Sequence, residues 1–406
     1  MTYSDGEDSE GSWARWLAML ALVVSTMSCG DVDPGAGADG SGSAGDGTNE
    51  LSTGEGADEG VDETGADPSS DPTRACEGRD HWRLLESPPQ PAVQSSVITL
   101  PDGTILVAGG LVRTAQPGYL AVASAARFDP ATDTWLPLPE LPHSRALHQI
   151  LPLDDGDVLL VGGSGGEPRA QLATSVRFDP DTEQWTPGPS LPDAVGLITS
   201  IAHGDLRVVM GQTRAFALEG AGWRELAPPP ASVVDDGLIG WGDDLLMIRR
   251  GQNPAMIYDP IADAWTEGPR EIDEHEQWGT PIGDFVLAVA LVEPDVVFIL
   301  GKTYGIHHWV ATQEVPATFS RGADRWIGGG QSPPLSHTVA RGLGDGRVLV
   351  MAGERAAIYL PERDRWCWTS EAPTQVQGTP VVLDDGSVFF PGGSAPDEPP
   401  YRWFPQ

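Results

Sequence analysis

Ala126-Arg127-Phe128-Asp129-Pro130-Ala131-Thr132-Asp133-Thr134-Trp135 is the stretch that decides the fold, because related phrases return at residues 176–185, 257–265 and 358–366. Each copy combines a strand with an aromatic residue, a turn that contains proline, and a second strand that carries tryptophan. Asp-Pro favours a tight turn because proline fixes φ at about −65° and the aspartate side chain accepts hydrogen bonds from the backbone beyond it. The phrase therefore predicts a repeated β-hairpin.

A second phrase precedes most copies of the first. It consists of an apolar strand, an Asp-Gly pair and another apolar strand that ends in glycine, and it occupies residues 97–110, 151–163, 343–353 and 381–393. Asp-Gly between β-rich runs predicts a hairpin with a primed turn, which needs positive φ angles. A glycine pair at the end of a strand indicates a bend or a close approach of two backbones.

Together the two phrases make a unit of four strands. Its closing tryptophan recurs about every 47 residues, in the range of the longer known repeats, at Trp82, Trp135, Trp185, Trp223, Trp265, Trp326 and Trp366. With its glycine pairs, its Phe/Tyr-Asp-Pro turns and its proline-rich exits, the chain from residue 82 to 406 resembles the kelch-repeat β-propellers. The resemblance implies an all-β propeller whose tryptophans pack between adjacent blades.

The two ends of this region complement each other. Residues 80–89 look like the last strand and exit of a repeat, whereas residues 401–405 align with residues 126–130 and stop one strand short of a full unit. We therefore expect the N-terminal strand to complete the sheet that the C-terminus begins, which would close the ring and remove open sheet edges. Counting this shared sheet, the sequence predicts seven blades; six or eight would follow from a miscounted degenerate repeat between Trp265 and Trp326.

The N-terminus carries the features of an export signal. Arg15 precedes an apolar run from Trp16 to Met27, which is too short to span a bilayer but has the length of a signal-peptide core. We place the signal segment at residues 1–29. Its closing Ser28-Cys29, followed by Gly30, resembles the lipobox of bacterial lipoproteins, which implies lipidation of Cys29. We expect an exported lipoprotein anchored in the outer membrane, periplasmic or on the cell surface; the alternative is an ordinary cleaved signal peptide and a secreted protein.

Residues 30–75 form a distinct segment before the propeller domain, residues 76–406. Gly, Ala, Ser, Thr and 12 acids dominate this segment, and Arg74 is its one base. Such a composition cannot bury enough apolar surface to offset the entropy of ordering, so it predicts a disordered, extended linker. The net charge of −35 disfavours nucleic acid and anionic lipid as partners, so membrane contact would come only through the lipid. We expect a monomer.

Cysteine usage is consistent with export. If Cys29 carries lipid, Cys76 and Cys367 remain, and both lie beside outer strands that would be neighbours in the closed ring. We predict a Cys76–Cys367 disulfide that clasps the closure; the alternative is two free thiols.

In kelch propellers, the loops between second and third strands and between blades share the face that usually binds ligands. Arg113, Tyr119, Arg145, His148 and Arg169 would lie on that face, together with two longer excursions, residues 270–279 and 302–318, which are long enough to indicate a binding role. The binding candidates are Arg113, Arg145, Arg169, Glu274, His275, Trp278, Tyr304, His307, His308 and Trp309. Adjacent His307 and His308 are poorly spaced for a metal in a strand, and we predict no metal site, cofactor or catalytic residue. The alternative is a metal site that combines His275, one of these two histidines and a carboxylate.

The resulting functional prediction is a non-enzymatic recognition module on the cell envelope that binds a protein or a glycan. The alternative is a propeller enzyme that acts on a carbohydrate. A galactose oxidase-like copper site would need a cysteine cross-linked to tyrosine. A sialic-acid mutarotase-like site would need an acid–base pair over arginines, for which Arg145, Arg169 and Glu274 are the candidates. Ser-His-Asp, phosphate-loop and paired-cysteine zinc patterns are absent from the sequence.

Overall fold

The computed structural model divides into two units, Met1–Glu63 and Thr64–Gln406, and the residues it describes all belong to the second. The described residues are 80–114, 118–166, 169–211, 213–230, 238–248, 255–268, 285–293, 296–304, 311–320, 327–328, 332, 338–352, 355–372, 380–392 and 399–405. The predicted signal peptide, the lipidation site Cys29, the acidic linker and Cys76 lie outside them.

The described chain is a β-propeller. Its strands form seven four-stranded antiparallel sheets, six of which are built from consecutive stretches of the chain, while the last combines strands from both ends. Sheets 1 and 2 consist of β2 (Ser96–Thr99), β3 (Ile105–Ala108), β6 (Ala125–Asp129) and β7 (Thr134–Pro137), and of β8 (Gln149–Pro152), β9 (Val158–Val161), β12 (Ser175–Asp179) and β13 (Gln184–Pro187). Sheets 3 and 4 consist of β14 (Leu197–His203), β15 (Leu206–Gly211), β16 (Ala215–Glu219) and β17 (Gly222–Glu225), and of β18 (Leu238–Trp241), β19 (Asp244–Met247), β20 (Met256–Asp259) and β21 (Ala264–Glu267).

The remaining sheets follow in chain order. Sheets 5 and 6 consist of β22 (Phe285–Glu293), β23 (Val296–Tyr304), β24 (Ala311–Ser320) and β25 (Ile327–Gly328), and of β26 (Thr338–Gly342), β27 (Val348–Ala352), β28 (Arg355–Leu360) and β29 (Arg365–Trp368). Sheet 7 consists of β30 (Val381–Val382), β31 (Val388–Phe390), β32 (Tyr401–Phe404) and β1 (His81–Leu84). Two short ribbons pair β4 (Leu111–Arg113) with β5 (Tyr119–Ala121) and β10 (Ser164–Gly165) with β11 (Ala170–Gln171).

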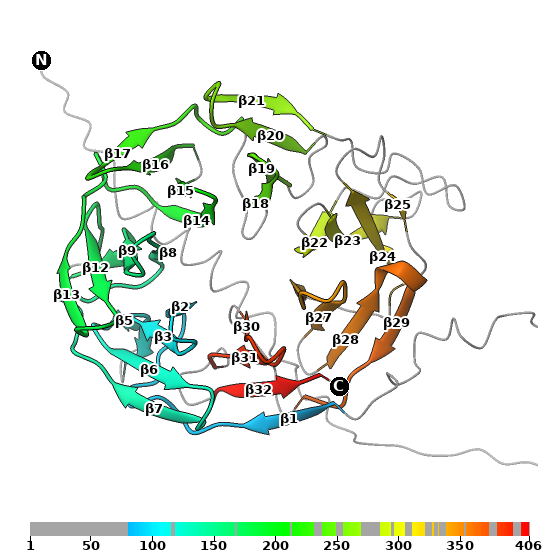
Figure 1. Cartoon of the computed structure of the whole chain (residues 1–406), viewed down its shortest axis with the longest axis horizontal. Helices are drawn as coiled ribbons and strands as arrows, with labels where there is room; N and C mark the ends of the chain where they lie inside the picture. The colour runs from blue at the N-terminus through cyan, green and yellow to red at the C-terminus, as the bar shows by residue number, and fades with distance from the viewer. Residues whose placement is uncertain are drawn as a thin grey trace, which may run out of the picture. The chain divides into compact units, whose positions relative to one another are not determined.

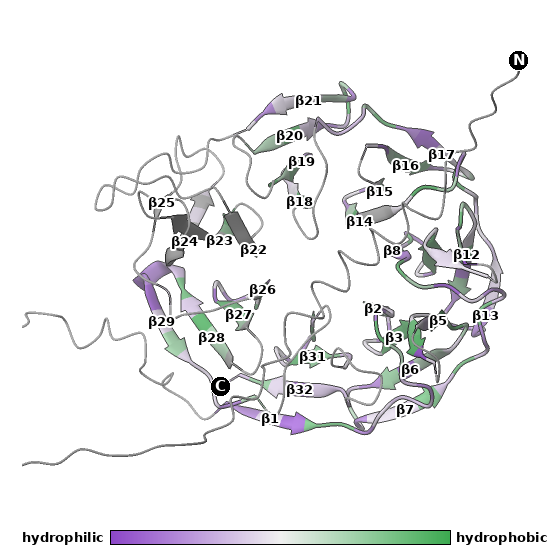
Figure 2. Ribbon diagram, turned by 180° about the vertical axis from the view of Figure 1, so that it is seen from behind, coloured by the Kyte–Doolittle hydropathy of each residue, from purple (hydrophilic) through white to green (hydrophobic). Residues whose placement is uncertain are grey.

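The sheets surround a central axis, with the first strand of each innermost and the last outermost (Figure 1). Six apolar clusters each combine residues from two neighbouring sheets, so sheets 1, 2, 3, 6 and 7 are buried on both faces, and sheets 4 and 5 on at least one. Figure 2 shows the result: strands such as β3 and β28 are hydrophobic, whereas the outer strands β1 and β17 carry hydrophilic residues. A blade is therefore stable only in the ring, as in other repeat architectures.

The predicted closure of the ring is confirmed. Strand β1 pairs antiparallel with β32, with Trp82 opposite Trp403 and Leu84 opposite Tyr401. Asp80 strengthens the seam, because its Oδ2 accepts hydrogen bonds from the Ser370 backbone N–H (2.8 Å) and from Trp403 Nε1 (2.8 Å). Both ends of the propeller thus belong to one sheet.

The repeated tryptophans pack between blades, as expected. Each described one lies in the apolar cluster that joins its own sheet to the preceding sheet. Five of them also donate from Nε1 to a carbonyl at the exit of the preceding sheet, at 2.7–3.1 Å: Trp82 to Ser370, Trp135 to Glu86, Trp185 to Pro139, Trp223 to Pro189 and Trp265 to Ala227. Trp326 lies outside the described residues.

The turns follow the sequence phrases with one correction. Asp129 accepts a hydrogen bond from the Ala131 N–H (2.8 Å), as its Asp-Pro turn predicts. The Asp-Gly hairpins form, but the prediction of primed turns was wrong: Gly103 has a φ of +81° while Asp102 keeps a negative φ. Gly103 donates to the Leu100 carbonyl, which gives a turn followed by one left-handed glycine. The fourth phrase has Leu360 in place of aspartate and forms the 3₁₀ turn η2 (Pro361–Arg363).

The excursion predicted at residues 302–318 is largely strand, since β23 continues to Tyr304 and β24 begins at Ala311. Hydrogen bonding between these two long strands, from Val296 with Ser320 to Tyr304 with Ala311, explains the difference. Nothing helical in the described part of the chain has the length and apolar character required to cross a membrane.

Candidate functional site

The antiparallel sheets have two unlike ends. One end, the turn end, carries the Asp-Gly turns between first and second strands and the Asp-Pro turns between third and fourth strands. The other end, the loop end, carries the connections between second and third strands and between successive sheets, which include the β4–β5 and β10–β11 ribbons. The predicted binding face corresponds to the loop end.

The two ribbons flank one connecting segment, residues 144–146. On one side Gly110 N–H donates to the Arg145 carbonyl (2.9 Å) and Arg145 N–H donates to the Val122 carbonyl (3.1 Å). On the other side Ala146 and Ser164 exchange two backbone hydrogen bonds of 2.9 and 2.8 Å. The ribbons of sheets 1 and 2 are therefore held next to each other at the loop end.

Both ribbons present side chains to solvent. On β4–β5, Arg113 is exposed, and Tyr119 and Leu120 keep 45% and 40% of their surface accessible. On β10–β11, Arg169 is exposed and its Nε donates to Ser164 Oγ at 2.8 Å. We call Arg113, Tyr119, Leu120 and Arg169 the ribbon surface.

Neither Arg113 nor Arg169 has an acidic partner among the described residues. All ion pairs between described residues involve other arginines. Desolvation lowers the pKa of Arg169, but an arginine remains protonated at neutral pH. The described residues of the two ribbons include no carboxylate, histidine or thiol, the groups from which a general acid or base is usually drawn. The described side chains of this surface are therefore suited to binding an anionic group.

Arg145 and His148 do not lie on the predicted face, because both are buried. Arg145 donates from Nη1 to the carbonyls of Gly162 (3.4 Å) and Thr174 (3.2 Å). His148 packs where the glycine pairs of two sheets leave room: a Cβ on Gly109 would come within 2.7 Å of His148 Cε1, and one on Gly163 within 2.8 Å of its Cβ. These residues lie in the contact between sheets 1 and 2.

Burial also determines the titration of this pair. Desolvation, assisted by the nearby charge of Arg145, lowers the pKa of His148 to about 3. Desolvation lowers the pKa of Arg145 to about 10. At neutral pH the imidazole is therefore neutral and the guanidinium is charged.

Most other predicted site residues lie outside the described residues: Glu274, His275, Trp278, His307, His308 and Trp309. Tyr304 ends β23, and the described structure does not extend to its side chain. Cys367 is buried in β29 and is disulfide-bonded. Its predicted partner Cys76 is outside the described part of the chain, so the pairing stays a prediction.

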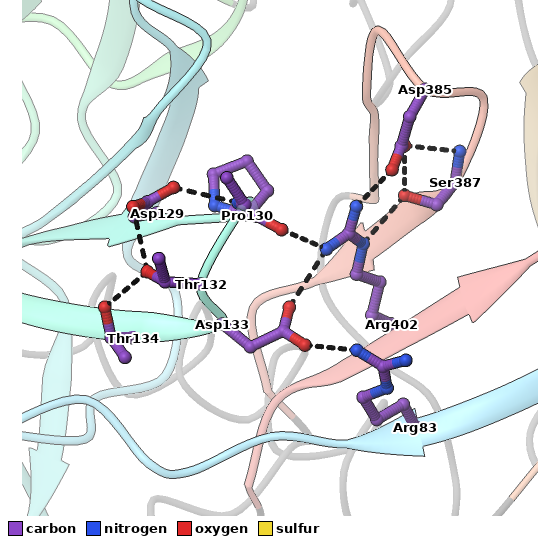
Figure 3. Close-up of polar contacts among 10 residues, drawn as sticks. Arg83, Asp129, Pro130, Thr132, Asp133, Thr134, Asp385, Ser387 and Arg402 are labelled. Atoms are coloured by element: carbon purple, nitrogen blue, oxygen red, sulfur yellow. Dashed lines mark hydrogen bonds and ion pairs between the residues drawn. The ribbon is translucent and has the colours of Figure 1, made fainter.

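An arginine network at the turn end was not predicted from the sequence. Arg402 on β32 donates to Ser387 Oγ (2.8 Å) and Asp133 Oδ1 (2.9 Å), and also to Asp385 Oδ2 and the Pro130 carbonyl (Figure 3). Arg83 donates to the other oxygen of Asp133. These contacts join the closing sheet to sheet 1.

The network repeats at the next contact between sheets. Arg127 pairs with Asp102 (3.3 Å) and donates to the Pro180 carbonyl (2.8 Å) of sheet 2. Burial alone would raise the pKa of Asp385, yet hydrogen bonds from Ser387 and the charge of Arg402 hold it below its ordinary value. The signal was present in the repeated phrase, where Arg127 and Arg402 occupy the same position before the aromatic residue.

No group of three or more His, Cys, Asp or Glu side chains in the described residues could hold a metal ion. This observation concerns only the described ranges, and the histidines at 275, 307 and 308 are not among them.

Comparisons with known proteins support the fold. No protein-family model matches the sequence, and no curated protein matches it. Among solved structures, the chain is similar to a fungal alcohol oxidase of the AA5 family in complex with copper, with a TM-score of 0.62 and 13% identity over 81% of this chain and 77% of that chain. It also matches the structure of YjhT, with a TM-score of 0.43 and 16% identity over 61% of this chain and 86% of that chain. At such identities the first likeness shows a shared propeller fold and nothing about activity.

Proposed function

We propose that this chain is a kelch-type recognition module that binds an anionic group of a protein or glycan through the ribbon surface. The observation that carries the proposal is the exposure of Arg113 and Arg169, which have no acidic partner among the described residues, on a chain whose net charge is −35. Several other solvent-accessible arginines in this acidic chain pair with neighbouring acids, for example Arg214 with Glu225. Exposed arginines without such a pair provide a local attraction for a negatively charged ligand.

The chemistry of the ribbon surface suits recognition. A guanidinium binds carboxylate, sulfate or phosphate through paired hydrogen bonds, and Tyr119 adds an apolar ring with a polar tip. Leu120 is also exposed, so a ligand with apolar groups beside its charge would bury surface there. Exposed arginine and tyrosine are the residue types that contribute most to binding energy at protein interfaces.

Display on the cell envelope belongs to the same proposal. Its support is the sequence alone: the apolar run before Cys29, and the acidic segment from residue 30 to 75 that would act as a spacer. A lipid on Cys29 would hold the propeller at the membrane while the spacer keeps the ribbon surface accessible to partners in the envelope or outside the cell.

A propeller enzyme acting on a carbohydrate is the second candidate, and the fold likeness is compatible with it. Two observations favour recognition. Arg145, which the mutarotase-like alternative needs at the substrate, is fully buried. Cys367 is disulfide-bonded and so cannot supply the cross-linked cysteine of a galactose oxidase-like site.

The test is a glycan array and a cross-linking pull-down from envelope extract with the full chain, its R113Q/R169Q variant and R363Q. Arg363 is the matched control, because it is exposed and unpaired among the described residues but lies on η2 at the turn end. We expect ligands rich in acidic groups to be retained by the wild type and by R363Q, weakened at high salt, and reduced at least tenfold in the double variant. Equal binding by all three proteins would reject the ribbon surface, and turnover of a bound sugar would favour the enzyme.

A further inference from the structure

The interior contact between sheets 1 and 2 contains a positive charge that no described residue neutralises. Arg145 has no exposed surface, and its hydrogen bonds run to three neutral oxygens: the Gly162 carbonyl (3.4 Å), the Thr174 carbonyl (3.2 Å) and Thr174 Oγ1 (3.5 Å). Its Nε is buried without a hydrogen-bond partner. Neutral oxygens can satisfy donors, but they do not compensate a buried charge.

His148 contributes a second unsatisfied group at the same place. Both of its ring nitrogens are buried and neither has a hydrogen-bond partner. Gly109 packs against the His148 ring and the Arg145 backbone, since a Cβ there would lie 2.7 Å from His148 Cε1 and 2.5 Å from the Arg145 carbonyl oxygen. The Arg145 charge is itself close enough to the imidazole to lower the pKa of His148. Buried polar atoms are nearly always paired, so two unpartnered groups side by side point to something that both bind.

Arg402 shows how the same molecule buries a guanidinium when its own residues supply the counter-charge. It is buried too, but Asp133 and Asp385 both accept from it. Among the described residues, no carboxylate forms an ion pair with Arg145. The missing partner must then come from outside the described protein groups.

We propose that Arg145 and His148 form an internal binding site for a small inorganic anion of the halide class. The anion accepts one hydrogen bond from Arg145 Nε and one from the protonated nitrogen of the neutral His148 ring. Because Gly109 and Gly163 bring the backbone so close to the imidazole, the site suits a monatomic ion rather than phosphate or a carboxylate ligand. The ion would neutralise Arg145 and stabilise the contact between sheets 1 and 2. This site is independent of the ribbon surface.

The test is thermal unfolding of the full chain in sodium gluconate, chloride and bromide at one ionic strength. Because a ligand that binds only the folded state raises stability with its concentration, we expect the Tm to rise by a few degrees as halide replaces gluconate. The rise should persist in R169Q and be lost in R145Q. If R145Q does not fold, H148F, which removes the ring nitrogens and keeps an aromatic ring, provides the same test.

Crystals grown in sodium bromide give the second readout. We expect an anomalous bromide peak within contact distance of Arg145 Nε and His148. Water alone at this position, or a Tm that does not distinguish bromide from gluconate in the wild type, would overturn the proposal. Either result would leave ligand binding at the ribbon surface unaffected, so the two proposals fail separately.

Discussion

In sheets 1, 2 and 7 the turn end and the loop end treat arginine in opposite ways, whereas in sheet 3 the loop-end Arg214 pairs with Asp193 and Glu225. At the turn end Arg127, Arg177 and Arg402 all pair with aspartates. At the loop end Arg113 and Arg169 pair with no described acid. Paired arginines join adjacent sheets or fix turns, whereas unpaired and exposed arginines add little to stability and remain free to bind. In sheets 1, 2 and 7 the paired arginines are therefore structural, and the proposed recognition rests on the unpaired ones of the ribbon surface.

Local sequence explains why the two ends differ. The Asp-Gly and Asp-Pro turns place aspartates at the turn end of each repeat, and those carboxylates lie within reach of an arginine on the third strand. The loop end of sheets 1 and 2 is built instead from glycine pairs and short ribbons. Glycine allows close backbone approach, as at Gly163, but supplies no counter-charge.

Acidification should cause the largest loss in the free energy of unfolding, because it protonates His148, which is buried at the loop end. The pKa of His148 is about 3 in the folded protein, against about 6.5 when unfolded. The unfolded chain therefore binds more protons between these values, and the stability from a neutral His148 is complete above pH 6.5 and is lost as the pH falls to 3. The loss amounts to about 5 kcal/mol.

Urea unfolding at several pH values gives the free energy of unfolding of the wild type and of H148F as a function of pH. The difference between the two slopes measures the contribution of His148. The carboxylates titrate in both proteins and cancel in the comparison. Equal slopes between pH 6 and pH 4 would show that His148 is not buried as a neutral ring.

Breaking the arginine network at the turn end should cause the second-largest loss of stability. R402Q leaves Asp133 and Asp385 without their shared partner, and we expect a loss of about 3 kcal/mol, the scale for removing one member of a buried ion pair. R347Q is the matched control, since Arg347 pairs with Asp345 inside a single hairpin turn; its loss should stay below about 1 kcal/mol. Equal losses of the free energy of unfolding in R402Q and R347Q would contradict a stabilising role of Arg402 between sheets 7 and 1.

A predicted covalent tie between sheet 6 and the segment before β1 should contribute less to the free energy of unfolding. If Cys367 pairs with Cys76, as the sequence predicts, C76S should destabilise the propeller by about 2 kcal/mol, and C29S should leave it unchanged. Thiol counting of the unlipidated full chain under denaturing, non-reducing conditions should find one free thiol in the wild type and none in C29S. The reverse pattern, in which only C29S is destabilised, would assign the disulfide to Cys29.

The smallest change in stability is expected for the ribbon surface. R113Q/R169Q should alter the free energy of unfolding by less than about 0.5 kcal/mol, as is usual for exposed residues outside ion pairs. A loss comparable to that of R402Q would mean that these arginines are structural, and the distinction between the two ends would no longer hold.

The repeated phrases predicted the propeller, the packing of the tryptophans and the pairing of residues 81–84 with 401–404, because each rests on a pattern that recurs along the chain. The burial of Arg145 and His148 could not be predicted in this way. They lie in a connection between sheets, where no periodicity indicates which side chains point inward. The turn-end arginines were missed for a different reason, since their partners, such as Asp133 for Arg402, lie far away in sequence.

Arginine-specific labelling of the native full chain with phenylglyoxal, read out by mass spectrometry, tests the contrast between the two ends most directly. Exposed guanidinium groups without an acidic partner should react first. We therefore predict rapid modification of Arg113 and Arg169, and slow modification of Arg127 and Arg402, whose side chains are 15% and 5% exposed. Equal rates at both ends, or protection of Arg113 and Arg169, would contradict the account.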